Sequence, residues 1–199
     1  MDLKERIIQT ALLLFGKYGV KSITMDEIAS GLGVSKRTLY ETFKDKESII
    51  MECYLYKKKI RNDYALEVMK ESDTVLDVIL KVQKKQFEDL LHVNQRFFDD
   101  LFKYYPRVEK MIKEDQAEHQ KEARDFFEKG VSQGIFRKDI VFGIISMLIT
   151  EQINWLMHSK LKEQFPFVKV FRTILYTYMR GISTPKGQEI LDKFIQTNE

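Results

Sequence analysis

The feature that most constrains this chain is a pair of helix start signals on either side of a glycine turn, between Thr24 and Lys46. Thr24 and Glu27 have the spacing of a capping box, in which a threonine hydroxyl and a glutamate carboxylate each accept from the other residue's backbone amide. Gly33 suits a turn because glycine adopts a positive φ without strain, and Ser35 then serves as the N-cap of a second helix. The stretch therefore predicts two short helices joined by a tight turn.

The second short helix carries the functional signal. At helical periodicity Leu39 and Phe43 share an inward apolar face. The neighbouring outward arc carries polar residues, which are Lys36, Arg37, Tyr40 and Glu41. An exposed helix with basic residues near its start fits the DNA major groove, where Arg and Lys donate to guanine O6 and N7. The alternative is a solvated basic face on a small helical domain, but the turn and the two caps in register favour DNA binding.

The segment GLGVSKRTLYETFKDKESI, with Thr24 upstream of it, resembles the DNA-binding signature of the TetR family of bacterial transcriptional regulators. The resemblance covers residues 3–50 closely, and the remainder matches in length and helical layout only. It implies that Lys36, Arg37 and Tyr40 approach base edges, and that phosphates are held by Thr24, Thr38, Thr42 and Lys46. Arg37 departs from the family pattern, in which many members carry glycine, and we expect this change to alter which operator is read.

Composition agrees with a helical, DNA-binding protein. The chain has 199 residues with 44% apolar and 32% charged residues, and only three prolines and nine glycines interrupt it. The net charge of +3 is too small to establish a nucleic-acid partner by itself. Its distribution is more informative, because the chain up to Arg61 has twelve Lys and Arg against eight Asp and Glu. The excess positive charge thus lies in the segment that would neutralise phosphates.

The sequence predicts a cytoplasmic protein with no membrane partner. Cys53 is the only cysteine, so no intramolecular disulfide can form, which fits a reducing compartment. The N-terminus has acidic residues and no cleavage site of the signal-peptide kind. The longest apolar run, residues 140–149, has about half the length that spans a bilayer.

No catalytic constellation is evident, and we expect neither an enzyme nor a cofactor. There is no phosphate-binding glycine loop, and the three histidines are far apart. Asp115 and His119 have the i,i+4 spacing of a metal site, but their surroundings are charged throughout. A solvated helix face is the better interpretation, so no metal is expected.

Apolar periodicity predicts an all-α fold with two domains. Residues 1–46 form a three-helix DNA-binding domain with a helix-turn-helix, and residues 47–199 form a helical ligand-binding and dimerisation domain. Further helices are expected over residues 3–18, from Asp45 onward, from Asp73 onward, and over residues 94–105, 107–129, 140–159 and 167–182. Asp139 is expected to cap the helix at 140–159. Pro185 and Gly187 are expected to end the helix at 167–182, before a short terminal helix.

Two late helices, residues 140–159 and 167–182, hold more apolar surface than one domain of this size usually buries. They are either core alone or an interface between two copies of the chain. The family resemblance implies that they pair with their copies as a four-helix homodimer interface. Its expected members are Ile145, Leu148, Ile149, Phe171, Ile174, Leu175 and Tyr178.

A small-molecule site is expected in the helices between Asp73 and Trp155, because this region is rich in aromatic residues and ligand pockets are typically apolar. The expected lining residues are Phe98, Phe102, Tyr104, Tyr105, Phe127, Gln152 and Trp155. The alternative is that these rings only fill the core, whereas the family resemblance favours a pocket.

Together these features predict a dimeric repressor that leaves a palindromic double-stranded DNA operator when a small hydrophobic or aromatic effector binds. The competing hypothesis is an all-helical small-molecule binding protein or enzyme without specific DNA binding. The two differ in a salt-sensitive affinity for DNA, which only the repressor should have.

Overall fold

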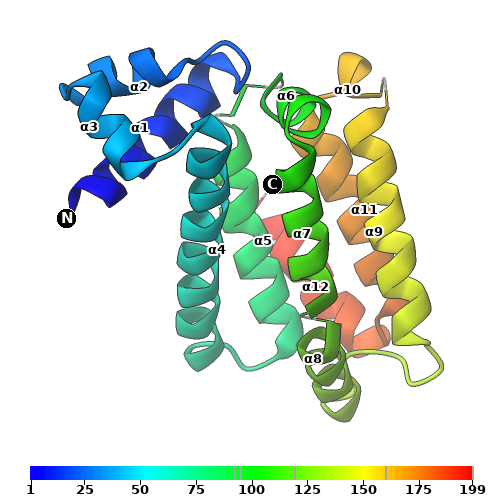
Figure 1. Ribbon diagram of the computed structural model, residues 1–199. Coiled ribbons are helices and arrows are strands. Elements are labelled where there is room, and N and C mark those ends of the chain that lie inside the picture. The colour runs from blue at the N-terminus through cyan, green and yellow to red at the C-terminus, as the bar shows by residue number, and fades with distance from the viewer. Residues whose placement is uncertain (92, 95, 119, 160, 199) are drawn as a thin grey trace. The chain divides into compact units, whose positions relative to one another are not determined.

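The computed structural model describes residues 1–91, 93–94, 96–118, 120–159 and 161–198, and every regular element in these ranges is a helix (Figure 1). The expected all-α class is therefore confirmed. The chain forms two compact units. Unit 1 comprises Met1–Asn62 and His92–Ala117, and unit 2 comprises Asp63–Leu91 and Glu118–Glu199. Neither unit ends at residue 46, and the functional boundary expected there stays a prediction.

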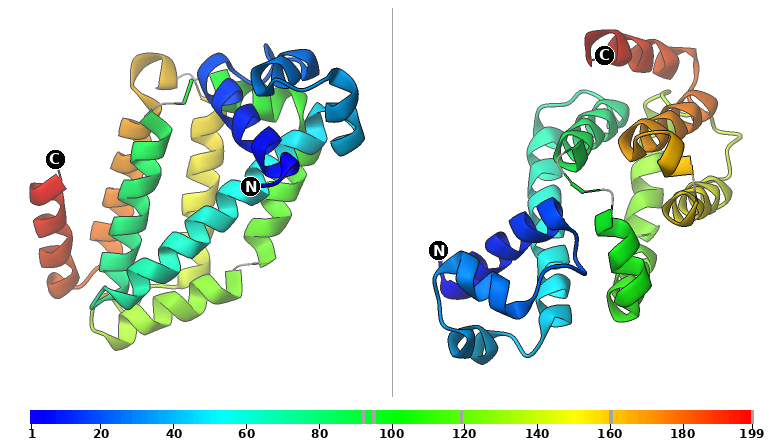
Figure 2. Two further views of the ribbon diagram at one scale, coloured as in Figure 1. Left: turned by 90° about the vertical axis from the view of Figure 1, so that its left-hand side faces the viewer. Right: turned by 90° about the horizontal axis from the view of Figure 1, so that it is seen from above.

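Unit 1 contains the predicted DNA-binding helices and three further segments. Its elements are α1 (Leu3–Tyr18), α2 (Met25–Leu32), α3 (Lys36–Thr42), the first part of α4 (Lys46–Lys70), α6 (Arg96–Tyr104) and nearly all of α7 (Pro106–Glu118). Figure 2 shows α1, α2 and α3 gathered at one end of this unit. Residues from all these segments share one apolar core, which joins Ile7 of α1 and Leu39 of α3 to Leu101 of α6 and Val108 of α7.

Helix α1 illustrates how local sequence defines an element of unit 1. Asp2 is its N-cap and accepts from the backbone amide of Glu5 at 2.7 Å. Ile7, Ala11 and Phe15 recur every fourth residue and are buried, so they form the inward face. Gly19 ends the helix with φ of 85°, a value that favours glycine.

Unit 2 is a helical bundle around a second core. Its elements are α5 (Val75–Leu91), α8 (Gln120–Ser132), α9 (Phe142–His158), α10 (Leu161–Gln164), α11 (Phe167–Ile182), α12 (Pro185–Asn198) and the last part of α4. Helix α5 packs against α8, α11 and α12, and α9 lies beside α11 (Figure 1). Among the described residues, Leu76, Leu80, Ile135 and Leu191 are the most deeply buried of this core cluster.

Two close approaches explain where glycine is needed in unit 2. A Cβ on Gly187 would lie 2.5 Å from the carbonyl oxygen of Ile135, and one on Gly130 would lie 2.3 Å from the Phe136 ring. Gly187 lies inside α12, and because it has no side chain this helix can pack closely on the loop before α9. The expectation that Pro185 and Gly187 end the preceding helix was wrong. That helix ends at Ile182, and Pro185 begins α12, a position that suits a residue without an amide hydrogen.

The cap expected before α9 also differs. The N-cap of α9 is Val141, which makes no side-chain capping bond. Asp139 instead receives two bonds from Arg137, from Nε at 3.1 Å and from Nη2 at 2.6 Å. The arginine also donates to the carbonyl of Gly181 at 3.1 Å, so this pair links the loop before α9 to the end of α11.

The expected helix over residues 107–129 corresponds to α7 and α8, which end and begin on either side of residue 119. Residue 119 is outside the described residues, as is the part of the expected metal pair that falls on it. Asp115 is largely buried in unit 1, where it binds Lys58 and accepts from the Tyr54 hydroxyl at 2.7 Å. Its expected place on a solvated face was therefore wrong.

No helix among the described residues is long and apolar enough to cross a membrane.

Candidate DNA-binding surface and effector region

The helix-turn-helix forms as the cap signals predicted. Thr24 Oγ1 accepts from the Glu27 amide at 3.2 Å, while Glu27 Oε2 accepts from the Thr24 amide at 2.6 Å. The hydrogen bond from the Thr24 backbone is the main cause that holds the pKa of Glu27 below its usual value. Ile23 and Ile28 on either side of this cap are both buried, which is the arrangement of a hydrophobic staple.

The turn and the start of α3 are equally well defined. Gly33 ends α2 with φ of 73°, in the left-handed region that favours glycine. Ser35 caps α3 by accepting from the Thr38 amide at 3.0 Å. Leu39 and Phe43 are buried below α3, so the opposite side of this seven-residue helix faces outward.

The three expected base-reading residues are all exposed on α3. The Arg37 side chain is 88% exposed, and its Nε donates to Glu41 Oε1 at 2.9 Å. Lys36 forms an ion pair with Asp26 at 2.9 Å. Tyr40 is 46% exposed, with the Lys36 ammonium 6.0 Å from its ring centre. The structure thus brings these three side chains to one face of α3, and their contact with bases stays a prediction.

Three of the expected phosphate-binding residues already use their hydroxyls within the protein. Thr24 Oγ1 donates to Glu27 Oε2 at 2.8 Å, as part of the capping box. Thr38 Oγ1 is 2.8 Å from Ser35 Oγ. Thr42 Oγ1 donates to the carbonyl oxygen of Thr38 at 3.1 Å. Each hydroxyl stabilises a helix end or turn. The hydroxyl protons of Thr24 and Thr42 are used in these bonds, so these two side chains keep acceptor capacity only.

Lys46 is placed differently from the other expected phosphate ligands. Its ammonium donates to the carbonyl oxygens of Ile23 at 2.6 Å and Val20 at 3.0 Å, both in the loop between α1 and α2. It also lies 5.6 Å from the ring centre of Tyr105. Partial burial is the main reason that the pKa of Lys46 is lowered. This lysine therefore ties the start of α4 to that loop, and its role at a phosphate stays a prediction.

The sequence did not indicate a set of contacts that joins α6 to α1 and the loop after it. Asp100 Oδ2 accepts from the Lys21 amide at 2.8 Å, and the Lys21 ammonium donates to the Tyr104 hydroxyl at 3.0 Å. The backbone amide of Asn94 donates to the Gly16 carbonyl at 2.7 Å. We call these the α6 latch. In each of these contacts the two residues are about eighty positions apart in the sequence, so no local pattern could have revealed the contacts.

The expected effector-binding residues fall into both units. Phe98, Phe102, Tyr104 and Tyr105 belong to unit 1, while Phe127, Gln152 and Trp155 belong to unit 2. In unit 2, the buried Phe127 ring stacks on Phe136 at 5.2 Å between ring centres and meets Phe142 at 5.4 Å. Phe127 is thus part of the core, and its contact with an effector stays a prediction.

Gln152 and Trp155 lie at the surface of unit 2. They line an open, mainly apolar groove together with Leu161, Phe165, Lys169, Val170, Thr173 and Ile174. Trp155 is 59% exposed in this groove. Ile174 was expected at the dimer interface, so the groove brings one expected interface residue beside two expected effector residues.

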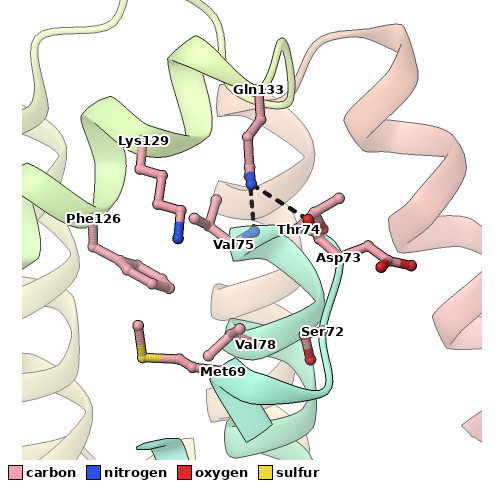
Figure 3. A pocket seen from close by; sticks show the side chains of 9 residues that line it. All are labelled: Met69, Ser72, Asp73, Thr74, Val75, Val78, Phe126, Lys129 and Gln133. Atoms are coloured by element: carbon pink, nitrogen blue, oxygen red, sulfur yellow. Dashed lines mark hydrogen bonds between the residues drawn. The ribbon is translucent and has the colours of Figure 1, made fainter.

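A second hollow lies where α5 begins (Figure 3). Gln133 reaches across it and accepts from the Val75 amide at 3.0 Å, and it donates to the Asp73 carbonyl at 3.4 Å. Phe126 and Met69 close the apolar side (Figure 3). Its volume of about 30 Å³ admits water-sized molecules but no metabolite. The two hydrogen bonds of Gln133 beside this hollow therefore stabilise the start of α5.

Two buried side-chain oxygens in unit 2, Gln83 Oε1 and Ser183 Oγ, have no hydrogen-bond partner among the described residues. Gln83 Oε1 is inaccessible to solvent. Gln83 follows Leu80 and precedes Phe87 on the buried side of α5. An unpaired buried acceptor costs stability, and it is available to a donor on a bound molecule.

The expected interface residues are half-buried in unit 2, apart from Leu148, which is 45% exposed. Helix α9 exposes further large apolar side chains, notably Ile144 at 57% and Met147 at 66%. Phe171 also has an inward contact, with its ring 5.6 Å from that of Phe87. Both helices thus support the core, and α9 also presents an apolar outer face.

No group of three or more potential metal ligands occurs among the described residues.

The family model described as "Bacterial regulatory proteins, tetR family" matches residues 7–53, which hold the helix-turn-helix described above. Residues 7–53 therefore carry the DNA-binding domain of the TetR family of bacterial transcriptional regulators, and the chain is a DNA-binding transcriptional regulator.

The relatives in sequence are HTH-type transcriptional regulators. An HTH-type transcriptional regulator of Staphylococcus aureus is 29% identical over 183 residues, which cover 80% of this chain and 93% of the relative. The HTH-type regulator YerO of Bacillus subtilis is 39% identical over 94 residues, which cover 43% of this chain and 30% of that protein. The match to YerO therefore spans less than a third of the relative.

The structural relatives show the same fold at low sequence identity. A TetR-family regulator from Marinobacter aquaeolei VT8 has a TM-score of 0.73 at 21% identity, covering 100% of both chains. A regulator from Saccharomonospora viridis in complex with choline has a TM-score of 0.70 at 19% identity, covering 91% of this chain and 97% of that chain. FadR from Bacillus subtilis, in complex with stearoyl-CoA, has a TM-score of 0.65 at 19% identity, covering 89% and 98%.

Proposed function

We propose that this regulator is a homodimeric repressor that binds a near-palindromic operator and leaves it when a small apolar or aromatic effector binds. In this proposal residues 1–46 read DNA, whereas residues 47–199 hold the effector and the partner subunit. Such a protein acts where the chromosome is, which agrees with the cytoplasmic location expected from the sequence.

The observation that carries the proposal is the outward face of α3. Its position is held by the Ser35 cap, the Gly33 turn and the buried Leu39, so the exposed side chains project from a rigid base. Lys36 and Arg37 lie at the start of the helix, where recognition helices contact base edges. A cationic, exposed face on a firmly anchored short helix is suited to the major groove and has no function in the core.

The dimer is supported by the outer face of α9. Ile144 and Met147 are one helical turn apart and both more than half exposed, and Leu148 is beside them. Contiguous apolar patches of this kind mark protein contacts in soluble proteins. A second copy of the chain is the natural occupant, because a dimer places two α3 helices on the two halves of a palindrome.

The effector is supported by the unpaired acceptor on Gln83 and by the ligands of two structural relatives. The relatives' complexes with choline and with stearoyl-CoA show that this fold holds chemically different molecules. We place the effector in unit 2, with its hydrogen-bond donor directed at Gln83 Oε1. The remainder of the molecule would lie among apolar and aromatic side chains.

The response to the effector is proposed to reach α3 through unit 1. Helices α6 and α7 belong to the same compact unit as the DNA-binding helices, and the α6 latch bonds α6 to the loop after α1. The chain connects unit 2 to α6 and α7 and also to α4. An effector that prefers one arrangement of these helices shifts the population away from the operator-binding spacing, by its difference in affinity for the two states.

The decisive experiment is selection of bound fragments from the source genome by the purified protein. We expect enrichment of a near-palindrome with half-site centres one helical turn apart, about 34–36 Å, or a multiple of it. Affinity should fall steeply with salt, since phosphate contacts release counterions. A well-folded protein that enriches no motif would contradict the proposal and favour a small-molecule binding protein or enzyme.

The effector is sought separately, by screening metabolites and hydrophobic drugs for thermal stabilisation and then for release of operator DNA. Hits that stabilise the protein and release DNA support the ligand part of the proposal. If no stabilising compound released DNA, the effector would be rejected while operator binding remained.

A further inference from the structure

Two of the three expected base-reading side chains are paired with carboxylates. Lys36 contacts Asp26 of α2 at 2.9 Å, and Arg37 contacts Glu41 of α3 at 2.9 Å. All four side chains are more than half exposed, at 61% and 60% in the first pair and 88% and 62% in the second. The surface of α3 that is proposed to approach DNA phosphates therefore carries two acidic groups next to its cations.

Folding explains the first carboxylate but not the second. Asp26 is in the first turn of α2, where a negative charge is favoured by the helix dipole. Glu41 is next to the last residue of α3, where the dipole disfavours a negative charge, and Arg37 is equally misplaced in the first turn. Acid before base is the more stabilising order for an i,i+4 pair, and α3 has the reverse order. Exposed ion pairs add little stability in any case.

The contact between Arg37 and Glu41 has a chemical consequence for base reading. The bond uses Nε of the guanidinium. Arginine reads guanine with two parallel donors directed at O6 and N7, and the Nη1 and Nη2 pair can supply them while Nε is held. A carboxylate at Nε therefore restricts the guanidinium to the end-on orientation. It also repels phosphates, which weakens binding at any sequence where Arg37 finds no guanine.

We propose that Glu41 is a positioning residue that determines the operator specificity of Arg37. It orients the guanidinium toward one guanine and lowers the affinity for sequences that lack this guanine. The inference rests on the proposed function, because it requires that α3 reads an operator. It concerns the selectivity of one base pair, whereas operator binding itself depends on the whole surface of the dimer.

The test compares Glu41→Gln with Asp26→Asn on a library of operator variants. Both substitutions remove one negative charge beside a cation of α3. We expect Glu41→Gln to reduce the preference at the base pair read by Arg37 about 5- to 10-fold, within the range that one bidentate contact supplies. Affinity for random DNA should rise several-fold. Asp26→Asn should raise the affinity for random DNA as well, and leave the preference at that base pair unchanged.

A double-mutant cycle separates positioning from charge. Arg37→Ala identifies the base pair, and Arg37→Ala combined with Glu41→Gln should show the same preferences as Arg37→Ala alone, because Glu41 has no guanidinium left to orient. Thermal unfolding of each variant checks that α3 remains folded.

The outcomes are distinct. If the unsubstituted protein enriches no operator, the proposed function fails before this test begins. If it enriches one and Glu41→Gln keeps the full preference at the Arg37 base pair, the positioning role is overturned while the function stands. If Glu41→Gln instead loses preference at another base pair, Glu41 is itself a base reader, for instance at a cytosine amino group, and the positioning role is equally overturned.

Discussion

The helix-turn-helix and the α9–α11 pair are specified in opposite ways. Every helix from α1 to α3 begins with a side-chain cap, and its inward apolar face is buried in the core of unit 1. The N-cap residues of α9 and α11 are Val141 and Pro166, and neither makes a side-chain capping bond. Helix α9 also exposes Ile144 and Met147. The apolar face of the first region is therefore covered within unit 1. The second has an apolar face that water alone covers poorly, so its final form depends on another molecule.

The largest expected effect comes from placing charges on the exposed face of α9. The double substitution Ile144→Glu with Met147→Glu should produce monomers, because two carboxylates would be buried in the interface. Loss of the bivalent contact should weaken binding to the full operator by about 10²- to 10⁴-fold. Analytical ultracentrifugation and operator titration measure the two effects.

The control is Leu66→Glu on α4, which adds a charge at an apolar position that is 58% exposed. It should leave the dimer and operator binding unchanged. Monomers of the double variant that still bound the full operator with native affinity would refute the proposed dimer. Because both substituted side chains are largely exposed, an unfolded product is not expected, and circular dichroism verifies this.

The next effect concerns single residues of α3 and α4. Arg37→Ala should relax discrimination at one base pair, at a cost of about 1–3 kcal/mol in binding to the operator. Equal weakening for every sequence would show that Arg37 does not read a base. The measurement is a binding titration on operators that differ at single positions.

Lys46→Ala provides the contrast to Arg37→Ala. It removes the donor to the Val20 and Ile23 carbonyls, and leaving such groups unpaired costs about 1–3 kcal/mol of stability each if they stay buried. If Lys46 also approaches a phosphate, all sequences should be bound more weakly and the salt slope should decrease. Reduced thermal stability with an unchanged salt slope would assign Lys46 to the fold alone.

A smaller effect is expected at Gln83. Gln83→Leu removes the buried, unpaired oxygen Oε1 and places an apolar side chain of similar size there, so the free energy of unfolding should rise by about 1 kcal/mol. The same variant should release operator only at higher effector concentration, since it lacks the acceptor. Denaturant unfolding measures the first change and effector titration the second. A variant with native effector sensitivity would remove Gln83 from the proposed pocket.

The smallest effect tests whether unit 1 is as self-sufficient as its caps suggest. Burial is the main cause that raises the pKa of the Cys53 thiol to about 12, so at pH 8 almost no thiolate exists in the folded protein. Alkylation at pH 8 should therefore be slow and should report opening of the unit 1 core. The rate should be unchanged in the monomeric α9 variant, and a large increase would show that the DNA-binding helices depend on the dimer.

The sequence predicted what depends on neighbouring residues. The Thr24 cap, the Gly33 turn and the bounds of α1 each follow from fewer than twenty residues of chain. Prediction from the sequence failed where the folded chain brings another group to the residue in question. Asp139 has the spacing of a cap for α9, but Arg137 holds it in the loop. Gly187 resembles a helix stop signal, but it lies within a helix, and glycine is required there because the Ile135 carbonyl leaves no room for a side chain.

The site was predictable to the same degree. The exposed face of α3 follows from periodicity, because Leu39 and Phe43 fix which side is inward. The partners of the side chains do not follow from it. Neither the pairing of Lys36 with Asp26 nor the carbonyl contacts of Lys46 have a sequence signature, since each joins residues that are ten or more positions apart.

The shared core of unit 1 has a consequence for how this protein can be divided and recombined. Leu101 and Val108 are buried with Ile7, Phe15 and Leu39, although they follow them by more than sixty residues. A fragment that stops after residue 62 would leave the apolar sites that these side chains fill open to water. The DNA-binding part is therefore not a detachable N-terminal module. A chimera that transfers its operator preference to another regulator should carry α6 and α7 with it, or transfer only the outward residues of α3.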